Sequence, residues 1–389
     1  MTPRPADGLR VTLAAGVRDA PAAAWDALLG PDASPFESHA WLAALEARAC
    51  VGPGTGFLPR PALAWRGEAL VGACAAYDKD DVQGELVDDA AWHLAAAQAG
   101  LPSYPKRALT SPFASAQGPR LLAHPALPPA ERAAVKAALL DALVADARAR
   151  GLRAVQLLHT TDADADAARE RGFVVTLGLH HRFRNAPPYA SFEAFLARFR
   201  SHRRNQIRRE RHRVGALDLR TRTLAGAAID EDHLEIVAAM QQAAQDRFLE
   251  VEPLVGMPHL LALRDALGPW LELILAEHAG RPVAAALNVV KDGVCHGRYW
   301  GSALEVDALY FEVCGYATCE RAIQAGLDVV DVGPGGLHHK ERRGFLAETV
   351  PSAVLAFDDA VGDALREHAA RERERARDIA QKSHRVFIR

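Results

Sequence analysis

The chain has 389 residues, of which 49% are hydrophobic and 24% are charged, and its formal net charge is -3. A domain commonly takes about 100 to 200 residues, so this length and composition are enough for two globular cores. The balanced charge excludes the overall basic character of a general nucleic-acid-binding protein. The five cysteines show no CxxC or Cys/His spacing, so we expect no metal site and a reduced, cytosolic protein.

Residues 1–25 contain prolines and charged residues in place of the apolar core of a signal peptide. No apolar run approaches the roughly 20 residues of a transmembrane helix. We therefore expect a cytoplasmic localisation, with any membrane contact made peripherally from the cytosol.

The first half of the chain, from about residue 11 to residue 185, has the pattern of one α/β unit. Hydrophobic periodicity predicts strands near 62–66, 69–77, 153–158 and 173–183. It predicts helices near 130–149 and 162–171. The segment 101–122 contains four prolines and a glycine, so it is predicted as a long loop.

A basic helix follows the Pro187-Pro188 junction. Ser191 is a suitable N-cap for this helix, which has an apolar pattern in its first two turns. Between Arg198 and Arg213 the chain has eight arginines and a single acid, Glu210. Such a run indicates an anionic partner, which is tRNA, coenzyme phosphates, an anionic membrane or the acidic segment 78–89 of this chain. No aromatic residues are interleaved to favour base stacking.

The second half, from about residue 214 to residue 358, repeats the alternation of strands and helices. Helices are predicted at 231–248, 257–267 and 308–325. Strands are predicted at 271–278, 282–291, 293–301, 328–333 and 349–357, with hairpin turns at Gly280 and Asp292-Gly293. An Arg/Glu-rich helix then covers 359–389, as a solvated face or packing arm, with a partner or ligand role as the alternative.

Two stretches of the chain repeat at a nearly constant offset. Residues 148–155 match residues 323–330, where a helical pattern stops at Gly-Leu and an apolar run follows. A basic-Gly-Phe corner then comes at Gly172-Phe173 in the first copy and at Gly344-Phe345 in the second. The repetition predicts two similar α/β domains, with the active site between them or in one of them.

Short motifs in one order along nearly the whole chain resemble the FemAB-like family of predicted N-acyltransferases. In the second half they are residues 297–301, 309–312, 333–340 and 343–345. Motifs in the first half and the basic helix contain Trp41, Glu85, Lys106, Arg203 and Arg204, which the resemblance makes candidate binding residues.

The resemblance implies an α/β (α+β) fold with two tandem Gcn5-related N-acetyltransferase-like domains, each with a mixed central sheet flanked by helices. The expected domains are 1–185 and 214–358, with a basic connecting helix at 186–213 and a charged C-terminal helix at 359–389. Tyr310 and His338-His339-Lys340 depart from the family pattern, and the glycine loop is one residue longer, which leaves the substrate open.

The implied activity is transfer of an acyl or aminoacyl group to an amine. We expect acyl-CoA or an acyl carrier protein as co-substrate, no tightly bound cofactor, and a peptide or small-molecule amine as acceptor. An aminoacyl-tRNA is the alternative donor. A third alternative is a ligand-binding protein whose acyltransferase fold has lost catalysis, since a fold does not prove a function.

Two carboxylates fall within the apolar stripe of the helix predicted from Ala308. Transfer to an amine needs a group that removes a proton, and a buried carboxylate must be either paired or functional. Glu312 and Glu320 are therefore candidate bases, with a structural ion pair as the alternative for each. The motifs add Tyr299 and His339 as further candidate catalytic residues.

The glycine loop offers a second candidate site. Gly333, Gly335 and Gly336 let backbone N–H groups converge on an anion, and Lys340 and Arg343 add positive charge. A phosphate, a carboxylate or an oxyanion would suit this loop, which lacks the spacing of a Walker motif. The alternative is a tight turn with charges facing the solvent.

Alternation along the strand predicted at 293–301 places Arg298 and His296 on the same face as Trp300, with Tyr299 opposite. Such a face suggests a polar pocket, with core packing as the alternative. His181, at the end of the last strand of the first half, is a weaker candidate of the same kind.

Overall fold

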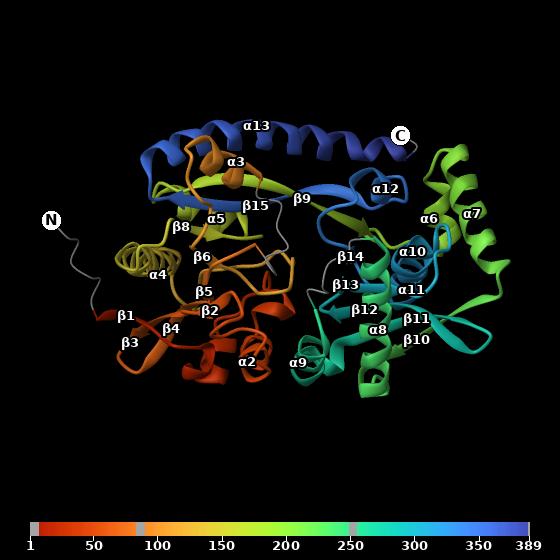
Figure 1. Ribbon diagram of the computed structural model, residues 1–389, viewed down its shortest axis with the longest axis horizontal. Helices are drawn as coiled ribbons and strands as arrows, with labels where there is room; N and C mark the ends of the chain where they lie inside the picture. Colours follow the sequence, from red (N-terminus) through yellow and green to blue (C-terminus); the bar gives the residue numbers. More distant parts are fainter. Residues whose placement is uncertain (1–7, 83–89, 249–254, 388–389) are drawn as a thin grey trace. The chain divides into compact units, whose positions relative to one another are not determined.

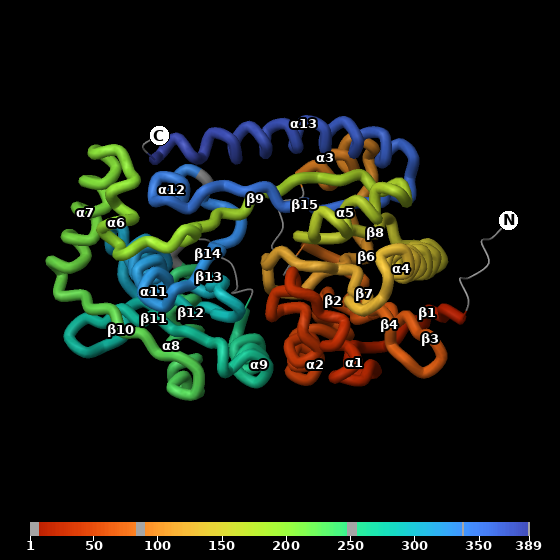
Figure 2. The backbone as a smooth tube through the Cα atoms, turned by 180° about the vertical axis from the view of Figure 1, so that it is seen from behind, coloured from red at the N-terminus to blue at the C-terminus, as the bar shows by residue number. Residues whose placement is uncertain are grey.

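The computed structural model describes residues 8–82, 90–248 and 255–387 (Figures 1 and 2). The chain forms two compact units, each built from two segments. Unit 1 comprises residues 1–178 and 349–377, and unit 2 comprises residues 179–348 and 378–389. The domain boundaries expected from the sequence stay predictions. None of the described helices is long and apolar enough to cross a membrane.

Unit 1 contains strands of two sheets. An antiparallel sheet has the order β1-β3-β4-β7, with β1 Leu9–Leu13, β3 Ala62–Arg66, β4 Ala69–Cys74 and β7 Leu122–Ala123. The other strands have the order β8-β6-β5-β2, with β2 Phe57–Pro59, β5 Ala76–Lys79, β6 Lys106–Leu109 and β8 Ala154–Leu157. Residues 353–356 of β15 (Leu346–Ala356) also pair with β8.

The helices of unit 1 bury apolar side chains. They are α1 (Ala22–Asp26), α2 (His39–Ala47), α3 (Ala90–Gln98), α4 (Pro129–Ala149), α5 (Asp162–Arg169) and the first part of α13 (Asp359–Ser383). α4 contributes Leu139 and Leu143 to the core, while Trp92 of α3 packs in one cluster with Leu365 of α13. The C-terminal helix is thus a packing arm.

The prediction of a long loop at 101–122 is wrong for residues 106–109. These residues form β6, an internal strand between β8 and β5. Pro105 and Pro112 flank this strand and do not interrupt it, so its N–H groups remain available for pairing. Its two charged residues are fully buried with polar partners: Arg107 Nε donates to Asp78 at 2.8 Å. Buried charges of this kind conceal a strand from hydrophobic periodicity.

Unit 2 has the strand order β10-β11-β12-β13-β14-β9. These strands are β9 Val174–Arg184, β10 Leu219–Ala225, β11 Leu271–His278, β12 Arg281–Lys291, β13 Val294–Ser302 and β14 Val329–Asp331. Neighbours are antiparallel except for β13 and β14, which are parallel. The helices are α6 Phe192–Ala197, α7 Ser201–Gly215, α8 Glu231–Phe248, α9 Met257–Leu267, α10 Leu309–Phe311, the π-helix η5 Glu312–Ala317, α11 Thr318–Ala325 and α12 Leu337–Glu341.

Helices cover both faces of the unit 2 sheet (Figures 1 and 2). α8 crosses β13 at Gly301, where an added Cβ would lie 2.1 Å from the backbone of Met240. On the other face, Tyr316 of η5 and Phe195 of α6 pack in one cluster with Val330 of β14. The sheet is therefore buried on both sides, as in other mixed α/β layers.

The two copies of the predicted repeat have the same local geometry. The glycines that end α4 and α11, Gly151 and Gly326, have φ of 72° and 67°. Gly172 and Gly344 of the two Gly-Phe corners have φ of 82° and 89°. The strand after each helix pairs in parallel with an earlier strand of its unit, β8 with β6 and β14 with β13. The mixed α/β class and the repeated unit are confirmed.

Candidate functional site

The parallel strands β13 and β14 of unit 2 separate after a short ladder. Residues 294–296 pair with residues 329–331, where β14 ends. From Gly297 to Ser302, β13 has β12 as its one strand partner in the described part of the chain. The other edge of this segment presents backbone groups that no strand occupies, which is a site where an extended molecule can bind.

A β-bulge changes the direction of side chains on β13. The register with β12 shifts by one residue at Arg298, because Leu287 lies opposite Tyr299 and Asn288 lies opposite Gly297. His296 and Tyr299 lie opposite odd-numbered residues of β12, whereas Trp300 lies opposite an even-numbered one. The prediction that His296, Arg298 and Trp300 share a face is therefore wrong, because the extra residue interrupts the alternation.

Asp331, at the end of β14, is the centre of a buried polar cluster. Its Oδ2 accepts a hydrogen bond from Arg182 Nε at 2.9 Å, and its Oδ1 accepts one from the Gly333 backbone N at 2.7 Å. His180 Nδ1 lies 3.4 Å from Oδ2. Burial alone would raise the pKa of Asp331, but His180 and the neighbouring arginines hold it well below its usual range. This constant negative charge fixes the start of the glycine loop.

His296 and Arg298 lie together beside this cluster. Nη2 of Arg298 is 3.2 Å from Nδ1 of His296. Burial, followed by the charge of Arg298, lowers the pKa of His296 to about 3. The imidazole is therefore neutral near pH 7 and accepts a hydrogen bond from the guanidinium. Tyr299 is buried on the face of His296, and Trp300 packs edge-on against Tyr310 with 5.5 Å between ring centroids.

Lys340 holds the shape of the glycine loop. Gly333, Gly335 and Gly336 have φ of 66°, 76° and 65°. The buried Nζ of Lys340 donates to the carbonyl oxygens of Val332 at 2.8 Å and residue 334 at 2.9 Å. Burial lowers the pKa of Lys340 to about 8. The carbonyl oxygen of Gly333, at 3.4 Å, is a third acceptor, so the three donors of Lys340 are all directed within the loop. A direct contact with an anionic substrate stays a prediction.

Arg211 of α7 joins the two predicted carboxylates. Its Nη2 lies 3.1 Å from Glu312 Oε1 and 2.8 Å from Glu320 Oε2. Glu312 is buried in η5, and π-helical turns are frequent at functional sites. Burial raises the pKa of Glu312, although Arg211 opposes this effect. The structural ion pair is present, and a catalytic role for either carboxylate stays a prediction.

Part of the arginine run is neutralised within unit 2. Arg208, Arg211 and Arg213 form ion pairs with acids. Arg203 donates to Gln206 at 2.8 Å. Across residues 8–82, 90–248 and 255–387, no carboxylate pairs with Arg200, Arg204 or Arg209. Arg200 and Arg209 are exposed and Arg204 is partly exposed, so these charges remain available for an anionic partner.

The other predicted site residues lie apart from the Asp331 cluster or are structural. His339 is exposed on α12, and its backbone O accepts a hydrogen bond from Arg343 Nη1 at 2.9 Å. In unit 1, Trp41 Nε1 donates to Ser111 Oγ at 3.2 Å and Lys106 Nζ donates to Gln156 Oε1 at 2.6 Å. Glu85 lies outside the described residues.

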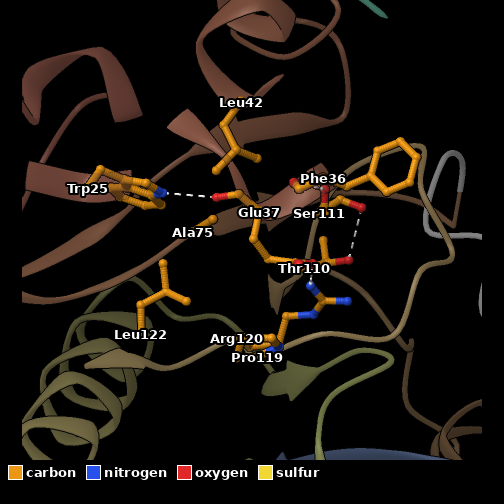
Figure 3. Close-up of a pocket in the computed structure, with 10 residues that line it drawn as sticks. All are labelled: Trp25, Phe36, Glu37, Leu42, Ala75, Thr110, Ser111, Pro119, Arg120 and Leu122. Atoms are coloured by element: carbon orange, nitrogen blue, oxygen red, sulfur yellow. Dashed lines mark hydrogen bonds and ion pairs between the residues drawn. The ribbon is translucent and has the colours of Figure 1, made fainter. Parts of the chain in front are cut away.

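Unit 1 also contains a small cavity of about 10 Å³, lined by residues that include Trp25 of α1, Leu42 of α2 and Leu122 of β7 (Figure 3). The Glu37–Arg120 ion pair, at 2.5 Å, forms part of its wall. Trp25 Nε1 donates to the Glu37 carbonyl at 3.0 Å. The volume holds about one water molecule, so this cavity is too small for a coenzyme.

The residue at the centre of the polar cluster was not predicted from the sequence. Asp331 lies between valines in the strand predicted at 328–333, and that contrast could have singled it out. Arg182 and Asn288, which also lie in apolar strands, were missed for the same reason. Within the described residues, no group of three His, Cys, Asp or Glu side chains is arranged to hold a metal ion.

The sequence matches the FemAB-like family, described as peptidoglycan biosynthesis/recognition, over residues 16–387. The chain belongs to the FemAB-like family. A comparison with curated protein sequences finds no match.

The fold of this FemAB-like protein is similar to the folds of several solved structures. FemX has 11% identity and a TM-score of 0.52, with 87% of this chain and 96% of that chain covered. L-PGS from Bacillus licheniformis has 11% identity and a TM-score of 0.51, with 91% and 99% covered. A tandem GNAT protein from the clavulanic acid biosynthesis pathway has 11% identity and a TM-score of 0.48, with 90% and 98% covered.

The likeness to FemX and L-PGS extends over most of the chain, as the described topology of both units requires. The predicted tandem Gcn5-related N-acetyltransferase-like fold is confirmed, and membership of the FemAB-like family supports a transferase.

Proposed function

We propose that this FemAB-like protein is a cytoplasmic N-acyltransferase that moves an acyl group from a thioester of coenzyme A or an acyl carrier protein to a primary amine of a peptide or small molecule. The supporting observation is the edge of β13 from Gly297 to Ser302, which no strand of the described residues covers after β14 has ended. A pantetheine arm carries amide groups, which can pair with such an edge as an added strand would. The family description favours a peptide-like acceptor.

The reaction requires a neutral amine. Its nitrogen attacks the thioester carbonyl, the amide C–N bond forms and the C–S bond breaks. The base takes one proton from the amine and passes it to the departing thiolate, which leaves as the thiol. Glu312 is the proposed base, because it is a buried carboxylate in a π-helical turn and burial raises its pKa. Backbone N–H groups of the β13 edge and the glycine loop are the proposed donors to the oxyanion.

The test is a donor panel with hexane-1,6-diamine as acceptor. Acetyl-CoA, decanoyl-CoA and a decanoylated acyl carrier protein are each incubated with the enzyme, and the amide product is measured by mass spectrometry. We expect product with at least one thioester, at a rate that ribonuclease leaves unchanged. Turnover with a charged tRNA as sole donor, abolished by ribonuclease, would contradict a thioester donor.

The second candidate is transfer from an aminoacyl-tRNA, which the exposed arginines of α7 favour. Arg204→Gln and Arg209→Gln together should then weaken tRNA binding and reduce the slope of log affinity against log salt by about 2. Arg208, which pairs with Glu193 at 2.5 Å, provides the control Arg208→Gln. For a thioester donor, wild type and both variants bind no tRNA.

A further inference from the structure

Two buried polar side chains of the unit 2 sheet have polar atoms without partners. Asn288 of β12 is 3% exposed, and its Nδ2 makes no hydrogen bond. His181 of β9 is 1% exposed, and neither ring nitrogen makes one. Buried polar atoms without partners destabilise a fold, so such a pair requires an explanation.

The two side chains lie on one face of the sheet. Asn288 is opposite Gly297 in the β12–β13 ladder. A Cβ on Gly297 would lie 3.3 Å from Val332 Cγ1, and the Val332 backbone N donates to the His181 carbonyl at 3.0 Å. Asp331 is paired with Arg182, and the next position of this antiparallel ladder brings Val332 beside His181. Because side chains alternate along a strand, Val332 and His181 lie on the face opposite to that of Asp331 and Arg182.

Asn288, Gly297, Val332 and His181 therefore form one row, which we call the Asn288–His181 row. It crosses four neighbouring segments spaced by roughly 4.8 Å, so its ends are roughly 14 Å apart. The row passes the point where β13 and β14 separate.

The middle of the row is small and apolar, and its surroundings are partly open. Gly297 and Val332 are both partly exposed, although they belong to a sheet that is otherwise buried. Trp300, which lies on the same face as Asn288, and Tyr310 of α10 are also partly exposed and touch each other. The row thus offers two polar ends and an apolar centre.

Charge distinguishes the two ends. Burial, followed by the charge of Lys340, lowers the pKa of His181 to about 4, so the ring is neutral near pH 7. A neutral imidazole offers one donor and one acceptor, and the nearby ammonium of Lys340 repels cations. The Asn288 end offers an N–H donor, which suits a carbonyl oxygen.

We propose that the Asn288–His181 row binds an extended acyl ligand, with its carbonyl oxygen at Asn288 Nδ2 and an uncharged amine or hydroxyl group at the His181 ring. The inference rests on the proposed transfer for the class of ligand. Its test includes a binding measurement that is independent of turnover.

The variants Asn288→Leu and His181→Phe remove the unpartnered atoms while keeping similar volume. Gln241→Leu is the matched control, because Gln241 Oε1 is also buried without a partner but belongs to α8, on the opposite face of the sheet. We expect all three to unfold at or above the wild-type temperature. Only the first two should lose transfer, by about 10-fold in kcat/KM, the effect of about 1.4 kcal/mol.

Binding is measured by calorimetry with N-(6-hydroxyhexyl)acetamide, which has a carbonyl and a hydroxyl group separated by an apolar chain. Wild type and Gln241→Leu should bind it, whereas Asn288→Leu and His181→Phe should bind about 10-fold more weakly. N-hexylacetamide, which lacks the hydroxyl group, should bind His181→Phe and wild type equally.

The two assays separate the inference from the proposed function. Probe binding that depends on both residues, in a protein without transfer, supports the row and overturns the transferase. Transfer that proceeds unchanged in Asn288→Leu and His181→Phe, or equal probe affinity in all variants, overturns the row.

Discussion

Arg343 and Glu210 lie 133 positions apart and form a two-point ion pair, with Nη2 2.8 Å from Oε1 and Nε 3.1 Å from Oε2. Both side chains are less than a tenth exposed. The Tyr316 hydroxyl also donates to Glu210, and the guanidinium lies over the Phe311 ring, 3.2 Å from its centroid. The single acid of the arginine run thus anchors the second basic-Gly-Phe corner to α7.

Arg343→Ala should lower the free energy of unfolding by about 3–5 kcal/mol, because it leaves the Glu210 carboxylate buried without its partner. Urea denaturation measures this loss. The double variant Arg343→Met with Glu210→Leu should lose less, since no charge remains buried. A single variant within about 1 kcal/mol of wild type would show that water replaces the pair.

Glu312→Gln should lower kcat for transfer by roughly 10²-fold, the usual effect of losing a general base, while the thermal midpoint changes little. Glu320→Gln is the matched control, because Glu320 contacts the same Arg211 atom and is more exposed. If both variants lose the same activity, the ion pair is responsible and Glu312 is not the base. Rates are compared at saturating donor.

The two repeat corners provide a pair of matched glycine substitutions. An alanine Cβ at Gly172 would have its nearest neighbour 4.0 Å away, so Gly172→Ala should cost about 1–2 kcal/mol for its positive φ alone. At Gly344 it would lie 2.6 Å from Phe195, which should add about 1–3 kcal/mol. The free energy of unfolding of both variants is measured by chemical denaturation. Equal losses for Gly172→Ala and Gly344→Ala would show that the Phe195 ring moves to make room for the added methyl group.

Acid should destabilise the protein through His181. Its folded pKa of about 4 lies below the ordinary value of 6.5, so between these pH values the unfolded chain binds a proton that the folded chain excludes. Stability therefore rises with pH across this window and is lost on acidification.

His181→Phe should flatten this dependence by up to about 1.4 kcal/mol per pH unit. Urea denaturation at pH 4.5, 5.5 and 6.5 measures the slope. His338→Phe, at a side chain that is 77% exposed, should leave it unchanged. A slope that is the same for His181→Phe and wild type would contradict burial of a neutral ring.

Local patterns predicted much of the fold. The helices at 231–248 and 257–267 have the predicted bounds, because their periodicity is regular over several turns. Positive φ at Ala279 and Gly280, and at Asp292 and Gly293, confirms the two hairpin turns. Both signals depend on neighbouring residues alone.

The site was less predictable, because its geometry depends on distant partners. After the bulge at Arg298, the side chains of β13 point to the faces opposite to those that simple alternation predicts. The sequence signal for this bulge was the neighbouring Gly297. The π-helix η5 has no recognisable pattern in the sequence. The contact between Arg211 and Glu312 joins residues 101 positions apart, which no local rule links.

The interrupted sequence of unit 1 affects how the protein is made. Residues 353–356, which complete its sheet, and the packing part of α13 emerge from the ribosome only after the whole of residues 179–348. At about 5–20 residues per second this delay is roughly 10 to 35 s. During that interval the edge of β8 is not yet paired with β15. A nascent chain stalled near residue 348 would therefore be a substrate for chaperones.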